Sequence, residues 1–289
     1  MFYFNYINNI ENNLKNSKKY HIFIKLIINI MIALCFLCSD SPNKSKYKNS
    51  AKYLILENII KNIDRSKFDI YVLYDNYNNI SLKNIINTNN IYKFDFNSLI
   101  TKYNSKVFDN YLYVGNCHLP LIDFMYSHNE YDGYLFYESD LFISKNAFTI
   151  INNIDYNNYD CILQNKRHKT NDAKHWLETT KNIPIKYLNN YYHGLYNIYY
   201  ISKKTLTNFH KYIKYNNYYG HHEILYNIYL LNNNLKINYL SNFLDVYTYY
   251  IDNHFDNKFN AYIKNICTDT FIMHPCKSVQ NFNKLINYI

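Results

Sequence analysis

The sequence predicts a single-domain α/β protein with a mostly parallel, Rossmann-like central sheet flanked by helices. Three segments near the start of the chain predict this class. Residues 30–37 form a short apolar run, typical of a fully buried strand. Residues 51–63 place apolar side chains at helical spacing, and residues 68–74 form a second apolar strand. Strand, helix and strand in this order indicate a right-handed βαβ unit, and therefore a parallel sheet.

The rest of the chain continues this alternation. The end of a further helix is expected at residues 85–86. Strands are expected at residues 91–95, 133–138, 160–164, 193–202 and 235–240, and helices at 119–128, 203–213 and 222–231. We find no internal repeat and no linker composition between these segments. One domain is therefore expected over residues 21–289, after a polar leader at residues 1–20.

The composition indicates a genome bias more than a function. Asn, Ile, Lys and Tyr, all encoded by AT-rich codons, dominate the 289 residues, and the chain has four Gly and four Pro. This usage is typical of some giant viruses and AT-rich protists. The net charge of +9 comes from scattered lysines rather than from one basic stripe. We therefore expect a solvated basic surface and no nucleic-acid partner.

The segment at residues 22–38 is the only membrane candidate. Lys25 and Asn29 interrupt it, and the apolar remainder is shorter than the roughly 20 residues that a spanning helix needs. A buried strand is favoured, and a type II membrane anchor is the alternative. Cys35 and Cys38 lie in this run and are expected to be buried thiols in a reducing compartment. The predicted location is the cytoplasm, meaning the host cytoplasm or a virus factory if the protein is viral.

An acidic turn follows the predicted strand at residues 133–138. Glu138 and Asp140 are separated by one residue, so in extended geometry both carboxylates face the same side. Two close carboxylates repel each other unless a cation or a proton lies between them. Hard oxygen ligands favour Mn²⁺ or Mg²⁺, and ligands of open α/β sheets lie at the carboxyl ends of strands. The alternative is that both are ordinary exposed loop charges.

Residues 132–143 resemble the acidic DxD-type segment of GT-A-fold nucleotide-sugar glycosyltransferases, in its E-x-D variant. Three later segments extend this resemblance. Residues 193–203 are similar to the acceptor-side strand and helix, residues 220–223 to a small residue followed by an acid, and residues 274–277 to a late H-P-x-K element. Together the segments cover roughly residues 30–278, and their order makes the combination more specific than any one of them.

The resemblance implies a GT-A-like domain with a nucleotide-binding half at about residues 21–145 and an acceptor half at about residues 146–289. It implies that Asp140 binds the metal directly. Glu138 would contact the ribose, a metal-bound water or the metal itself. His274 would be the third group on the metal side or a contact to the diphosphate. The implied cofactors are Mn²⁺ or Mg²⁺ and a UDP- or GDP-sugar donor.

The resemblance also implies the remaining site residues. Lys277 would bind the diphosphate as a point charge, Asp75 would lie near the base or ribose, and Ser39 would be close to it. In an inverting enzyme a carboxylate deprotonates the acceptor hydroxyl, and Glu223 is the candidate. With Asp140 it forms the predicted catalytic pair. An ordinary first-turn glutamate is the alternative for Glu223.

Several functional alternatives stay open. The predicted activity is metal-dependent transfer of a sugar to a hydroxyl of a glycan, lipid or protein acceptor, by inversion or retention. The same carboxylates would also suit a nucleotidyl or phosphoryl transferase. A third alternative is an inactive glycosyltransferase-like protein with a viral structural or carbohydrate-binding role. The adjacent histidines His221 and His222 are expected to contribute at most one ligand to a single ion.

Overall fold

The computed structural model describes residues 30–38, 51–75, 90–105, 116–165, 180, 182–184, 196–248, 259, 263, 266 and 268–288. The chain forms two compact units, Met1–Ile30 and Met31–Ile289, and every element described below belongs to the second. The predicted leader, Ser39 and the predicted helix end at residues 85–86 lie outside the described residues.

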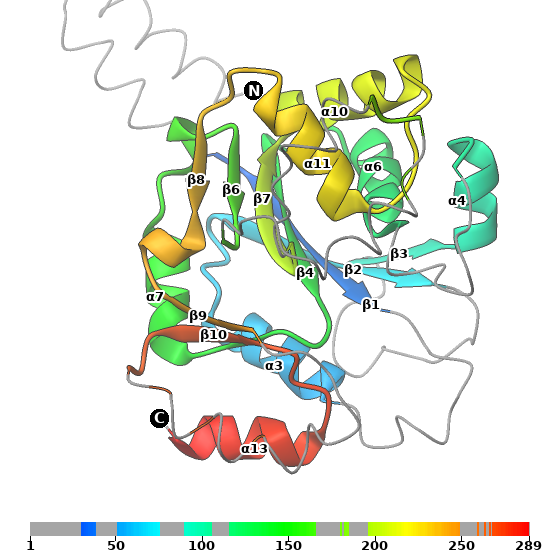
Figure 1. Ribbon diagram of the computed structural model, residues 1–289. Coiled ribbons are helices and arrows are strands. Elements are labelled where there is room, and N and C mark those ends of the chain that lie inside the picture. Colours follow the sequence, from blue (N-terminus) through cyan, green and yellow to red (C-terminus); the bar gives the residue numbers. More distant parts are fainter. Residues whose placement is uncertain are drawn as a thin grey trace, which may run out of the picture. The chain divides into compact units, whose positions relative to one another are not determined.

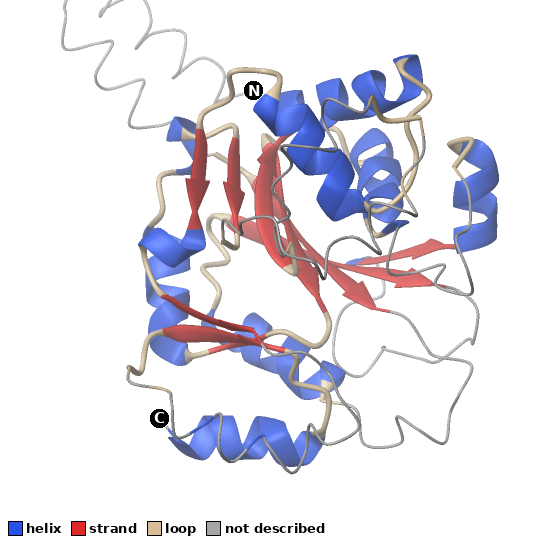
Figure 2. Cartoon of the chain, viewed as in Figure 1, coloured by secondary structure: helices blue, strands red, loops and turns tan. Residues whose placement is uncertain are grey.

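A seven-stranded sheet forms the centre of the second unit (Figures 1 and 2). Its strand order is β3-β2-β1-β4-β7-β6-β8. Neighbouring strands run parallel except at β7, which is antiparallel to both β4 and β6. The strands are β1 (Ile32–Cys38), β2 (Phe68–Asp75), β3 (Ile91–Phe94), β4 (Gly133–Glu138), β6 (Cys161–Leu163), β7 (Ile198–Ser202) and β8 (Ile237–Tyr239). The predicted mostly parallel α/β class is confirmed.

The βαβ unit predicted at the start of the chain is present. All seven residues of β1 are buried, as expected for a central parallel strand with both faces covered. Helix α3 (Lys52–Asn62) buries Ile55, Leu56 and Ile59, which share one helical face, and leads into β2. The C-terminal part of the candidate membrane segment is therefore a strand of the sheet, and Cys35 and Cys38 are buried in it.

Helices cover the sheet on both faces. α6 (His118–Ser127), α10 (Lys203–Tyr215) and α11 (His222–Leu231) pack on one face with α4 (Phe96–Lys102) nearby (Figure 1). Alternate β1 residues, Ala33, Cys35 and Leu37, point into this cluster because successive strand side chains face opposite sides. On the other side α3 contacts α7 (Lys145–Asn153) and α13 (Val279–Tyr288).

A second sheet of three short strands lies beside the first. Its order is β5-β10-β9, with β5 at Phe142–Ile143, β9 at Asp245–Thr248 and β10 at Phe271–His274. β10 pairs antiparallel with β5 and parallel with β9. None of these strands was predicted. Their pairing joins segments that lie far apart in the chain, which a local pattern does not record. The pairing of β5 with β10 brings the end of the chain to the acidic turn.

Two short 3₁₀ turns complete the described elements, Tyr156–Asn158 and Leu240–Asn242. Within the part of the chain that the structure describes, no helix combines the length and the apolar character that crossing a membrane requires.

Candidate active site

The acidic turn lies where the order of the sheet changes direction. From β1 the chain continues to β2 and β3 on one side, and it returns to β4 on the other side of β1. Leu37 near the end of β1 is consequently flanked by Leu73 of β2 and by Glu138 of β4. Ligands of open α/β sheets bind beyond the carboxyl ends of the strands at such a switch point. Glu138, the last residue of β4, lies at this edge.

Glu138, Asp140 and His274 form a compact group. Each offers one ligand atom, and the three atoms lie within 4.8 Å of one another. His274 Nε2 is 3.2 Å from Asp140 Oδ1 and 3.7 Å from Glu138 Oε2. Lys277 Nζ lies 3.7 Å from Asp140 Oδ2. Four residues predicted as site residues are thus brought together by the structure.

The small sheet explains why His274 reaches the turn. Met273 pairs with Phe142 in the antiparallel ladder between β10 and β5, which places the following residue opposite the acidic turn. The backbone N–H of Cys276 also donates to the Asp140 carbonyl over 2.5 Å. Backbone hydrogen bonds therefore join the acidic turn to β10 and to the residues that follow it. The side-chain contacts of Asp140 and His274 form between these two backbone segments.

The ionisable side chains of this group shift each other's pKa values. Burial and then the neighbouring Asp140 raise the pKa of Glu138. Burial also acts to raise the pKa of Asp140, but His274 and Lys277 outweigh it and hold that pKa at about 2. For His274, burial lowers the pKa, yet the carboxylates of Asp140 and Glu138 outweigh it and raise the pKa overall. The carboxylates thus favour a positive charge between them, which is what a cation site requires.

Two amide side chains that the sequence did not point to support Glu138. Asn197 Nδ2 donates to Glu138 Oε2 over 2.6 Å, and the Asn197 backbone carbonyl accepts the Glu138 N–H over 2.8 Å. The Asn197 N–H in turn donates to Gln164 Oε1 over 3.2 Å. Because β7 runs antiparallel to β4, the residue just before β7 lies at the carboxyl end of β4. No local pattern reveals this register, so the sequence carried no signal for Asn197.

Glu223 lies in the first turn of α11 and is buried. Its Oε1 accepts the Tyr196 N–H over 3.2 Å, and its own N–H donates to His221 Nδ1 over 3.4 Å. The carboxylates of Glu138, Glu223 and Asp140, after burial itself, all contribute to raising the pKa of the Cys117 thiol. Cys117 is the N-cap residue of α6, and its sulfur lies within 4.8 Å of a Glu138 carboxylate oxygen.

Asp75 ends β2 and is buried. β1 separates β2 from β4, so Asp75 stands on a strand about 10 Å from the strand of Glu138. That separation excludes Asp75 from the metal group and leaves it at the same carboxyl edge of the sheet. Its predicted contact with the base or ribose stays a prediction.

The sequence matches no protein-family model and no curated protein. Among solved structures, the chain resembles the bifunctional glycosyltransferase WbbM in its apo form, with a TM-score of 0.52 and 14% identity over 90% of this chain. The chain spans 50% of the length of WbbM. The fold is therefore GT-A-like. The predicted fold class is thereby confirmed.

Two further solved structures align less well. One is the galactosyltransferase LgtC in complex with donor and acceptor sugar analogues, with a TM-score of 0.47, 10% identity, and coverage of 84% of this chain and 87% of LgtC. The other is apo mouse xyloside xylosyltransferase 1, with a TM-score of 0.49, 8% identity, and coverage of 86% of this chain and 97% of that protein.

Proposed function

We propose that the protein is a metal-dependent glycosyltransferase that moves a sugar from a nucleotide-diphosphate sugar to an acceptor hydroxyl. One observation carries the proposal: Glu138, Asp140 and His274 converge within 4.8 Å at the switch point of a GT-A-like sheet. Two carboxylates and an imidazole suit Mn²⁺, and Mg²⁺ is the second candidate. The acceptor belongs to the broad class of glycans, lipids and proteins that carry hydroxyls.

The residues of the site have distinct proposed roles. Asp140 and His274 hold the cation, with Glu138 as the third ligand or as a contact to the ribose. When bound, the cation supplies Lewis-acid stabilisation of the charge that develops on the leaving diphosphate. Lys277 presents an ammonium group 3.7 Å from Asp140 and adds positive charge for the diphosphate. Ser39 and Asp75 are proposed contacts of the nucleoside part of the donor.

Glu223 is the proposed general base if the reaction inverts the anomeric centre. Its carboxylate would take the proton of the acceptor hydroxyl as the new glycosidic bond forms. The Tyr196 N–H fixes the orientation of the carboxylate, and Glu223 lies in the first turn of α11. A retaining reaction does not need this base.

Calorimetry with UDP- and GDP-sugars, with and without Mn²⁺, tests the proposal. We expect donor binding that depends on the metal, together with slow donor hydrolysis. Asp140→Asn should weaken Mn²⁺ binding at least about tenfold, because it removes a charged ligand. Asp155→Asn makes the same chemical change in an exposed capping residue outside the group and should leave binding unchanged.

Two results would overturn the proposal. The first is donor binding that survives both a chelator and Asp140→Asn. The second is turnover of nucleoside triphosphates in place of nucleotide sugars, which identifies a nucleotidyl transferase.

A further inference from the structure

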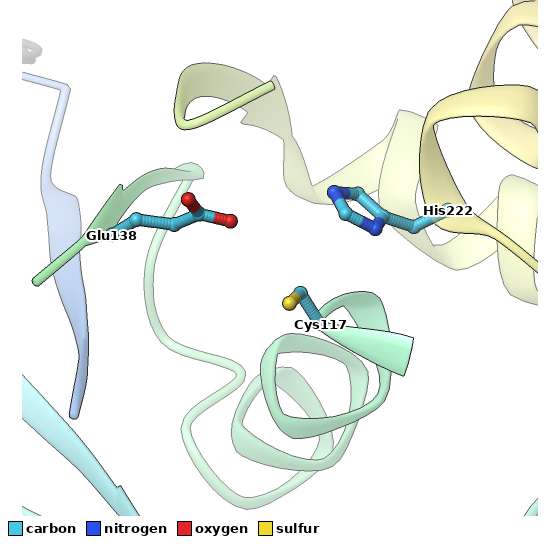
Figure 3. Close-up of side chains that lie close together, drawn as sticks. All are labelled: Cys117, Glu138 and His222. Atoms are coloured by element: carbon cyan, nitrogen blue, oxygen red, sulfur yellow. The ribbon is translucent and has the colours of Figure 1, made fainter. Parts of the chain in front are cut away.

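A second cluster of metal-ligand side chains lies next to the first. Cys117, Glu138 and His222 each offer one ligand atom, and these atoms lie within 4.8 Å of one another. Figure 3 shows the Glu138 carboxylate and the His222 imidazole pointing toward each other, with the Cys117 side chain beside the space between them. The three residues come from the N-cap of α6, the end of β4 and the start of α11. Three separate elements therefore aim their side chains at one point.

The fold holds these side chains in place. Cys117 is 5% exposed and His222 is 2% exposed, and Glu138 accepts the hydrogen bond of Asn197. The His222 ring stacks on His221, with centroids 5.0 Å apart and planes 20° apart. A cluster that is already ordered loses little conformational entropy when an ion binds.

The ligand types differ from those of the first cluster. There, two carboxylates and an imidazole suit a hard cation. Here a sulfur replaces one carboxylate, and a set of sulfur, nitrogen and oxygen selects Zn²⁺ or Co²⁺ over Mn²⁺ and Mg²⁺. In a tetrahedral zinc site the ligand atoms are about 3.5 Å apart, so separations of up to 4.8 Å have to close by at most about 1.3 Å. Side-chain rotation at Glu138 and Cys117 covers such a distance.

The charge around the cluster also favours a cation. Glu138 is itself one of the ligands, and Asp140 lies two residues beyond it. Glu223 follows His222 directly in α11 and is buried, so three carboxylates lie close to this position. On binding, the metal takes the place of the thiol proton, which leaves to solvent.

We propose that Cys117, Glu138 and His222 form a site for a thiophilic divalent cation, Zn²⁺ in the first place. Three protein ligands leave the fourth tetrahedral position open to water or to another ligand. The site is distinct from the proposed manganese site and shares only Glu138 with it. Its test accordingly uses Cys117 and His222, which the manganese site does not contain.

Cobalt absorption gives a direct readout of thiolate ligation. Titration of the full chain with Co²⁺ should produce a sulfur-to-cobalt charge-transfer band that Zn²⁺ removes by displacement. Cys117→Ser should abolish the band and weaken Zn²⁺ binding at least about tenfold, measured by competition with a chromogenic chelator. His222→Gln should weaken binding to a similar degree and keep the band.

Two controls separate this site from other thiols and from the first cluster. Cys161→Ser makes the same change in a buried thiol of β6. Asp140→Asn removes a ligand of the first cluster that is not a ligand of the second. Both variants should keep the band. Cys117→Ala replaces the serine variant if circular dichroism shows that the latter does not fold. A wild-type chain without the band, or a band that survives Cys117→Ser, overturns the proposal. Manganese binding without zinc binding would refute this site alone.

Discussion

Replacing Asn197 with alanine removes one hydrogen bond from the candidate metal site and leaves the sheet intact. Its side chain donates to Glu138 over 2.6 Å, while its backbone stays bonded to Gln164 and Glu138. Burial and Asp140 raise the pKa of Glu138, and the Asn197 bond opposes this rise. A hydrogen bond to a charged group contributes about 1.5–3 kcal/mol, so we expect the Kd for Mn²⁺ to rise about 10- to 100-fold.

The loss of Mn²⁺ affinity in Asn197→Ala should depend on pH, and its direction follows from the ionisation of Glu138. A cation needs ionised Glu138, and the alanine variant raises the pKa of this carboxyl further. Protons therefore compete with the metal more strongly in the variant, and most strongly at acidic pH. The affinity deficit of the variant should shrink as the pH rises. Calorimetric Mn²⁺ titrations of both proteins, from mildly acidic to mildly alkaline pH, measure this.

A matched control removes the same kind of group elsewhere. Asn90 Nδ2 donates to the Ile70 carbonyl over 2.8 Å and touches no candidate ligand, so Asn90→Ala should bind Mn²⁺ as the wild type does. Wild-type affinity in Asn197→Ala, or an affinity deficit that grows with pH, would contradict the proposed role of Asn197 in keeping Glu138 ionised.

Three further predictions concern catalysis and stability. Glu223→Gln should lower the transfer rate at least about 100-fold without changing the affinity for Mn²⁺. The control Glu57→Gln, on the exposed face of α3, should change neither the rate nor the affinity. A Glu223→Gln enzyme that stays fully active excludes Glu223 as the general base. Burial raises the pKa of Asp123, but hydrogen bonds from Lys102, Tyr92 and Tyr103 at 2.5–2.7 Å outweigh it and hold the pKa below its usual value. Asp123→Asn should therefore lower the free energy of unfolding by about 2 kcal/mol at neutral pH. Urea titrations should show this gap closing as the pH falls below about 4, where the unfolded wild-type chain takes up the proton first and the folded protein takes it up at still lower pH. A gap that does not depend on pH contradicts this prediction. Gly220 has φ +133°, and an added Cβ would lie 2.4 Å from Thr180 Cα. Gly220→Ala should therefore lower the free energy of unfolding by about 1–3 kcal/mol, measured by chemical denaturation. An unchanged free energy of unfolding would argue against this backbone conformation.

The elements with clear periodicity follow from the sequence alone. The apolar run of β1, the helical spacing of α3 and the strand β2 follow from local side-chain patterns, and together they dictated the parallel βαβ unit. Glu138 and Asp140 were also visible, because two residues of one turn need no long-range contact to be neighbours. These parts depend on interactions within a few residues along the chain, which a sequence pattern records.

The distant residues that join the acidic turn are set by the tertiary fold. The resemblance to GT-A glycosyltransferases suggested His274, but the antiparallel pairing of two short strands, β5 and β10, is what brings it to Asp140. Asn197 reaches Glu138 through the register between β4 and β7, and Cys117 meets His222 because α6 and α11 both begin at this edge. Strand order and register are set by the burial of whole faces and by backbone hydrogen bonds between remote segments. No local pattern encodes them.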